Sequence, residues 1–126
     1  MKQGLNKVNW KDLKVWNESH DLVKRLYKIL SSFPKEEMYG LSSQMKRAAV
    51  SVPTNIVEGF SRNTTKEYIL FLFNSRGSLE ELRYLSLLSL ELGFLPKEDY
   101  DYIAESCEGI SKMLNALIKK LKDKIE

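Results

Sequence analysis

The chain has 126 residues and a net charge of +3; 43% of its residues are hydrophobic, 29% are charged, six are glycine and three are proline. This composition indicates one ordered, helix-rich domain, residues 1–126, that is large enough to bury a core without disulfides or structural metals. The single cysteine, Cys107, excludes an internal disulfide, and the longest apolar run, residues 68–73, is too short to span a membrane, so we expect a cytoplasmic protein.

Residues 1–12 show no hydrophobic period, and we expect them to form a flexible or loosely docked arm. Apolar residues then recur at helical spacing and predict a first helix over residues 13–32, which Pro34 ends. Its apolar positions are Leu13, Trp16, Val23, Leu26, Tyr27 and Leu30. His20, the only histidine, fits a half-buried position on this helix.

The stretch that follows predicts a second helix over residues 42–60 with one packed and one polar face. The packed face is formed by Met45, Ala48, Ala49, Val52, Ile56 and Phe60, and the polar stripe by Arg47, Ser51, Asn55, Glu58 and Arg62. Pro53 lies inside this pattern, and its missing N–H predicts a kink. The alternative is two shorter helices that meet at the proline. Gly59 and the polar run after it end the element.

Residues 65–92 predict a third helix, which Gly93 ends. One face carries Tyr68, Ile69, Leu72, Leu79, Leu82 and Leu90, but Phe73, Tyr84, Leu85 and Leu88 point elsewhere. Because more than one side of this helix is apolar, we expect the protein to self-associate. Arg76, Glu80 and Arg83 form a ladder along the helix, which fits either local pairing or a structural contact between helices or subunits.

A fourth helix is predicted over residues 96–123, with Pro96 at its first position and acidic residues in its first turn. It carries a heptad seam at Ile103, Cys107, Ile110, Leu114, Leu117 and Leu121. No segment has the pattern of a strand. The sequence therefore predicts an all-α fold, an antiparallel up-down-up-down four-helix bundle. The predicted core is Trp16, Val23, Leu26, Leu30, Met45, Ala49, Val52, Ile56, Leu72, Leu79, Ile103, Cys107, Ile110, Leu114 and Leu117.

The residues that could carry catalysis are few. His20 and Cys107 are the only histidine and cysteine, and no third group completes a catalytic triad with them. One histidine cannot supply the two Glu-x-x-His pairs of a di-metal bundle, and the sequence has no glycine-rich phosphate loop. We therefore predict no catalytic residues, no metal site, no cofactor and no enzyme activity.

Basic side chains are the main candidates for a binding role. Residues 1–66 hold 12 Lys and Arg against 6 Asp and Glu, whereas residues 67–126 hold 8 against 11. The candidate contacts to nucleic acid are Lys46, Arg47, Arg62, Lys66, Lys24, Arg25 and Lys28. Arg47 and Arg62 stand about 22 Å apart along a helix, so each could meet a different phosphate. A structural or assembly role is expected for Pro53, Asn55, Glu58, Gly59, Arg76 and Glu80.

Several motifs, in this order, resemble a known family: four-helix-bundle proteins encoded in intervening sequences of bacterial large-subunit ribosomal RNA genes. The motifs are Leu13-Lys-Val-Trp16, Phe33-Pro-Lys-Glu-Glu37, Tyr39-Gly-Leu-Ser-Ser-Gln44, Arg47-Ala-Ala-Val-Ser-Val-Pro53, Asn55-Ile-Val-Glu-Gly59 and Gly77-Ser-Leu-Glu-Glu81. The family is similar to the accessory variability determinant of diversity-generating retroelements, a basic pentameric barrel that binds nucleic acid and a reverse transcriptase. The resemblance implies a bacterial cytoplasmic bundle that forms a ring-like homo-oligomer, with a pentamer as the expected state.

Two functional hypotheses follow from the residues and the resemblance together. The first is an oligomer that binds RNA or DNA through basic helix faces. The second is a homo-oligomeric scaffold that docks an acidic or helical protein, such as a reverse transcriptase, with little nucleic-acid binding of its own. Neither hypothesis involves a membrane.

Overall fold

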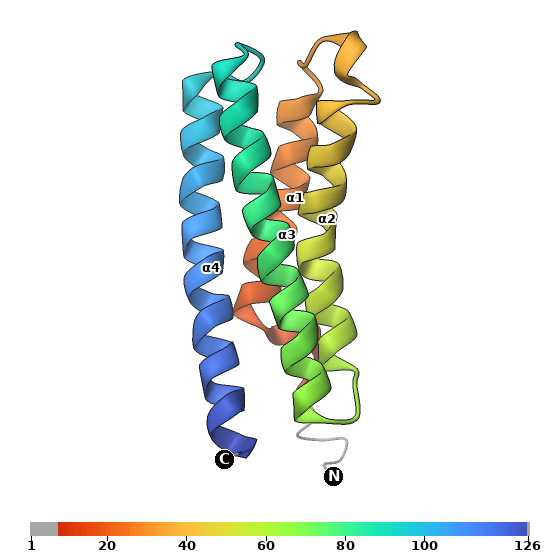
Figure 1. Ribbon diagram of the computed structural model, residues 1–126, viewed down its shortest axis with the longest axis vertical. Coiled ribbons are helices and arrows are strands. Elements are labelled where there is room, and N and C mark those ends of the chain that lie inside the picture. Colours follow the sequence, from red (N-terminus) through yellow and green to blue (C-terminus); the bar gives the residue numbers. More distant parts are fainter. Residues whose placement is uncertain (1–7, 126) are drawn as a thin grey trace.

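The computed structural model describes residues 8–125, which form four long antiparallel helices packed side by side (Figure 1). In chain order these are α1 (Lys14–Leu30), α2 (Leu41–Phe60), α3 (Thr65–Glu91) and α4 (Lys97–Ile125). They run up, down, up and down along one axis, and no residue in the described range forms a strand. The all-α four-helix bundle predicted from the hydrophobic periods is therefore confirmed.

Two short 3-10 helices complete the fold, η2 (Trp10–Asp12) before α1 and η3 (Lys35–Glu37) before α2. The side-chain oxygen of Asn9 accepts a hydrogen bond from the Lys11 N–H (2.9 Å), and the Asp12 carboxylate accepts one from the Asn9 N–H (3.1 Å). This capping box orders a turn within the stretch expected to be a flexible arm. Residues 1–7 of that predicted arm lie outside the described range.

Helix α2 continues from Leu41 to Phe60 with Pro53 inside it, so the alternative of two separate helices is wrong. Pro53 has no N–H to donate to the carbonyl of Ala49, four residues earlier. Its side chain is buried, and next to it the Ser75 hydroxyl of α3 donates to the Val52 carbonyl (2.9 Å). The helix is therefore packed against its neighbours at the proline.

Most of the predicted core is buried, but α1 is turned relative to the prediction. Trp16 and Val23 are half-buried and Tyr27 is 46% exposed, whereas Val15, Leu22 and Ile29 fill the core. A similar shift occurs late in α4, where Ile118 is buried and Leu117 only half-buried. A straight helix has 3.6 residues per turn, whereas a heptad seam assumes 3.5, so the seam rotates by about 20° per heptad around the helix, away from the core. After two heptads the residue that faces the core is therefore the next one along the chain, Ile118 in place of Leu117.

Helices α2 and α3 approach each other closely at Gly59, one residue before the end of α2. A Cβ atom added to Gly59 would lie 2.8 Å from Phe71 Cβ and 3.1 Å from the Tyr68 carbonyl oxygen. Only glycine, which has no side chain, permits this approach of the two backbones. Leu85 of α3, which the sequence placed off the main face, is also buried.

Candidate functional site

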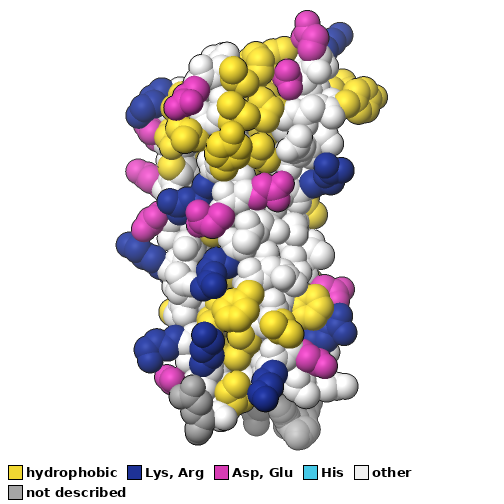
Figure 2. Space-filling model, in the orientation of Figure 1, with side chains coloured by type: hydrophobic (Ala, Val, Ile, Leu, Met, Phe, Trp, Pro, Cys, Tyr) yellow, Lys and Arg dark blue, Asp and Glu magenta, His cyan; other side chains and the backbone are white. Residues whose placement is uncertain are grey.

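The bundle separates its charges along its axis. The end that holds residues 8–18, 55–76 and 112–125 carries ten Lys and Arg against five Asp and Glu. The opposite end, formed by residues 19–54 and 77–111, carries eight against eleven. In Figure 2 acidic side chains gather on the upper part of the face, and basic ones outnumber them on the lower part. Most of the excess comes from the end of α4, because residues 112–125 carry five Lys against one Asp, whereas residues 55–76 carry three Lys and Arg against two Glu, and residues 8–18 are balanced. We call the end of the bundle with this excess the basic end.

Arg62 and Lys66 lie at the corner between α2 and α3, within the basic end. The Arg62 guanidinium donates to the Glu58 carboxylate (3.1 Å) and lies over the Phe71 ring at 4.5 Å. Lys66 is exposed in the first turn of α3. Glu58 therefore orients Arg62 on the surface of the bundle, which is a structural role within the chain.

Arg76 is held between α3 and α4. Its guanidinium donates to the Asn115 side-chain oxygen (2.8 Å) and lies 4.9 Å from the centre of the Phe73 ring. The predicted ladder of Arg76, Glu80 and Arg83 forms only in part. Glu80 pairs with Arg83 (3.6 Å), and among the described residues no ion pair joins Glu80 to Arg76. Arg76 thus makes the contact between helices, and the local-pairing interpretation applies to Glu80.

The other predicted cations lie elsewhere. Lys46 of α2 stands over the exposed ring of Tyr27 of α1 at 4.8 Å. Lys24 pairs loosely with Asp21 (3.6 Å), while Arg25 lies over the Tyr102 ring of α4 at 4.4 Å. The remaining two, Lys28 and Arg47, are exposed. The seven candidate residues therefore do not form one surface: two belong to the basic end, one to the α1–α4 seam, and four to the other end of α1 and α2.

Asn55 has a role within the chain. Its amide donates to the Ser51 carbonyl (2.8 Å) and the Ser51 hydroxyl (2.9 Å), and the Ser78 hydroxyl of α3 donates to that same Ser51 oxygen (2.9 Å). This relay ties α2 to α3 near the middle of the bundle. The polar stripe predicted on α2 is thus partly covered by α3.

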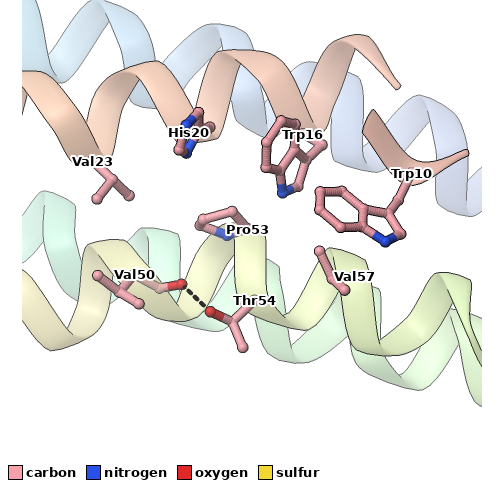
Figure 3. Close-up of a pocket in the computed structure, with 8 residues that line it drawn as sticks. All are labelled: Trp10, Trp16, His20, Val23, Val50, Pro53, Thr54 and Val57. Atoms are coloured by element: carbon pink, nitrogen blue, oxygen red, sulfur yellow. Dashed lines mark hydrogen bonds between the residues drawn. The ribbon is translucent and has the colours of Figure 1, made fainter. Parts of the chain in front are cut away.

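A surface that the sequence did not predict lies between α1 and α2. It has two hollows, of about 330 and about 560 Å³, which share Val50 and Thr54 and so form one continuous groove. We call this the α1–α2 groove (Figure 3 shows the first hollow). The first hollow is lined by Trp10, Trp16, His20, Val23, Val50, Pro53, Thr54 and Val57, and the second by Tyr27, Lys46, Arg47, Val50, Ser51 and Thr54.

The groove has a sequence signal that could have revealed it. On α1 the lining residues are Trp16, His20, Val23 and Tyr27, and on α2 they include Lys46, Val50, Pro53 and Val57, beside Arg47, Ser51 and Thr54. Both sets repeat with steps of 4, 3 and 4, so each helix carries a second stripe beside its core stripe. Trp16 and Val23 were predicted to lie in the core, so this surface was not predicted.

Within residues 8–125 no group of three His, Cys, Asp or Glu side chains is placed to hold a metal ion. None of the helices in this range is sufficiently long and apolar to cross a membrane. Burial raises the pKa of the Cys107 thiol to about 12, which leaves it protonated and a poor nucleophile at neutral pH.

Comparison with known proteins identifies the family. A solved structure from Bacteroides thetaiotaomicron, described as a protein of unknown function from the S23 ribosomal protein family, superimposes with a TM-score of 0.78. It is 23% identical, and the match covers 83% of this chain and 95% of that one. No curated protein matches the sequence. The model of the family described as 23S rRNA-intervening sequence protein matches residues 11–116. The chain therefore belongs to the 23S rRNA intervening-sequence protein family.

Proposed function

We propose that this protein is a cytoplasmic, non-enzymatic bundle that binds RNA or DNA through its basic end. The proposal rests on the separation of charge along the bundle. The basic end carries twice as many Lys and Arg as Asp and Glu, and this produces a local positive potential that the net charge of +3 does not reveal. Phosphates are the ligands that such a surface attracts.

The cations at this end are of two kinds. Arg62 and Arg76 are held by hydrogen bonds and by aromatic rings, so they would keep a fixed position against a phosphate. Lys66, Lys119 and Lys120 are exposed on flexible stems and would add charge without defining geometry. Such a surface favours binding to the backbone, with little discrimination between base sequences.

The test is the salt dependence of binding to a generic RNA. Replacing Lys119 and Lys120 by Gln should flatten the slope of log affinity against log salt by about 0.7 to 0.9 for each phosphate that the variant no longer neutralises. Arg62→Gln with Lys66→Gln should have a similar effect. The matched control is Lys97→Gln, an exposed lysine at the acidic end, which should leave the slope unchanged. Wild-type protein that binds neither RNA nor DNA at about 50 mM salt would end this proposal.

A homo-oligomeric scaffold is the second candidate, and the outer face of α3 favours it. Leu70 and Tyr84 are 59% and 60% exposed on this helix, and Leu87 is 39% exposed. Figure 2 shows hydrophobic patches toward both ends of the face, with charged side chains of both signs between them. Apolar patches of this kind mark interfaces more often than they mark free surface. We propose that copies of the chain assemble through this face, and the family resemblance makes a pentamer the expected state.

Light scattering at micromolar concentration tests the assembly. Leu70→Glu and Tyr84→Glu should each shift the protein toward the monomer of 14.6 kDa. Glu98→Gln, exposed in the first turn of α4 and away from this face, is the control that should leave the mass unchanged. Wild-type protein that is already a monomer would refute this interface. Such a result would leave the nucleic-acid proposal to be judged by its own test.

A further inference from the structure

The first hollow of the α1–α2 groove reaches into the basic end through Trp10, Trp16 and Val57, but its lining is chemically unlike the charged surface there. This hollow is almost entirely apolar, with Trp10 and Trp16 on one side and Val57 on the other (Figure 3). The hydroxyl of Thr54 already donates to the Val50 carbonyl (2.7 Å), so it is not available to donate to a ligand. An occupant of this hollow must therefore be apolar where it meets these side chains.

The second hollow adds positive charge. Lys46 and Arg47 line it, and Lys24 and Lys28 lie on the neighbouring surface of α1. Residues 19–30 and 41–54 together carry five Lys and Arg but a single carboxylate, Asp21. An occupant that extends from the first hollow into the second would therefore gain from carrying negative charge at that end.

Length further restricts the occupant. The lining positions on α2 extend from Lys46 to Val57, which corresponds to about 16 Å along the helix axis, or about three turns of a bound helix. An amphipathic helix presents apolar side chains at i, i+4 and i+7, which matches a groove of this length between two antiparallel helices.

The aromatic side chains of the groove favour a peptide over a single-stranded nucleic acid. The Trp16 ring is stacked on His20, with 4.6 Å between centroids and 13° between planes, and Trp10 packs edge-on against Trp16. Lys46 covers the face of Tyr27. These contacts engage one face of the Trp16 ring and one face of the Tyr27 ring, which leaves less aromatic surface for the stacking of unpaired bases.

We propose that the α1–α2 groove binds an acidic amphipathic helix of a partner protein. The apolar anchors of that helix fill the hollow beside Trp16, Pro53 and Val57, and its Asp or Glu side chains lie near Lys46 and Arg47. The inference is independent of nucleic-acid binding at the basic end.

The probe is a displayed library of helical peptides of about 16 residues, long enough to span the groove, with randomised apolar and flanking positions. Selection on the wild-type protein should enrich apolar residues at i, i+4 and i+7, with Asp or Glu clustered at one end. A labelled synthetic copy of an enriched peptide is then measured by fluorescence anisotropy. Binding should weaken when salt is raised from about 50 to about 300 mM, since the charges are screened.

Two variants test the two halves of the groove. Val50→Asp places a carboxylate where the hollows meet, and because Val50 is 39% exposed the helix should still form, which circular dichroism checks. It should weaken peptide binding at least tenfold, as should Lys46→Glu with Arg47→Glu. The matched control, Lys119→Glu with Lys120→Glu at the basic end, should leave peptide binding unchanged and reduce RNA binding instead.

Each other outcome contradicts the proposal. If the enriched peptides bind the Val50→Asp variant as tightly as the wild-type protein, the groove is not a peptide site. The same conclusion follows if selection on the wild-type protein enriches no peptide that selection on the Val50→Asp variant does not also enrich. Loss of RNA binding in the groove variants would assign the groove to nucleic acid. Dissociation of a wild-type oligomer by Val50→Asp would show that a second copy of the chain covers it.

Discussion

Replacing Gly59 by alanine tests the close approach of α2 and α3 at this glycine. The new Cβ would lie 2.8 Å from Phe71 Cβ, 3.0 Å from Tyr68 Cδ1 and 3.1 Å from the Tyr68 carbonyl oxygen. Two of these three atoms belong to the backbone or to the first carbon of a side chain, so they cannot move aside by a rotamer change. Helix α3 would have to shift away from α2.

The size of the effect follows from two opposing terms. Alanine in place of glycine within a helix normally stabilises a protein by about 0.5 to 1 kcal/mol. Overpacking of a tight interface costs about 1 to 3 kcal/mol. Gly59→Ala should therefore reduce the free energy of unfolding by about 1 kcal/mol, within limits of about 0 and 2.5 kcal/mol set by the two ranges.

Two other glycines supply matched controls. A Cβ at Gly77 in α3 or at Gly109 in α4 would meet no atom within 4 Å. Gly77→Ala and Gly109→Ala should therefore stabilise the protein by about 0.5 to 1 kcal/mol, the helix-propensity term alone. The sign of the change should thus differ between Gly59 and the two controls.

Urea unfolding followed by far-UV circular dichroism measures all four proteins. The protein concentration must be the same throughout, since self-association would make the apparent stability depend on it. Equal stabilisation by all three alanines would refute the reasoning, because it would mean that α2 and α3 do not approach closely at Gly59.

Three further predictions concern the core. Leu114→Ala removes a fully buried side chain and should cost about 2 to 5 kcal/mol in urea unfolding; a loss below about 1 kcal/mol would show that α4 packs through another face. The buried hydroxyl of Ser86 has no hydrogen-bond partner among the described residues, so Ser86→Ala should leave the free energy of unfolding unchanged or raise it. Ser75→Ala removes the hydrogen bond to the Val52 carbonyl of α2 and should lower the free energy of unfolding by about 1 kcal/mol. The Cys107 thiol should resist alkylation near pH 8 until urea is added. Burial raises the pKa of this thiol from 9.0 to about 12, so as the pH rises the unfolded chain loses the thiol proton before the folded chain does. The free energy of unfolding should therefore fall between about pH 9 and about pH 12. Cys107→Ala should remove part of this dependence of the free energy of unfolding on pH.

Local sequence patterns determined most of the fold. The apolar period of the second helix kept its phase across Pro53, and the structure has one helix there. The heptad seam of the fourth helix correctly identified Ile103 through Leu114 as core. These predictions succeeded because a helix buries whatever stripe its own sequence makes apolar, and that stripe is readable without knowing its neighbours.

Tertiary structure decided which apolar residues stay at the surface and which charges lie together. Trp16 and Val23 resemble core residues in the sequence, but α1 and α2 leave them lining the groove. The end of α4 supplies most of the charge of the basic end by itself, but only antiparallel packing brings Arg62 and Lys66 of the α2–α3 corner to the same end of the bundle. The sequence pattern placed Arg47 and Arg62 in one polar stripe, yet Arg47 lines the groove, whereas Arg62 lies just beyond the end of α2 and is held over Phe71 of α3. Helical periodicity gives the direction of each side chain around its own axis, whereas a surface shared by several helices depends on how those axes are packed.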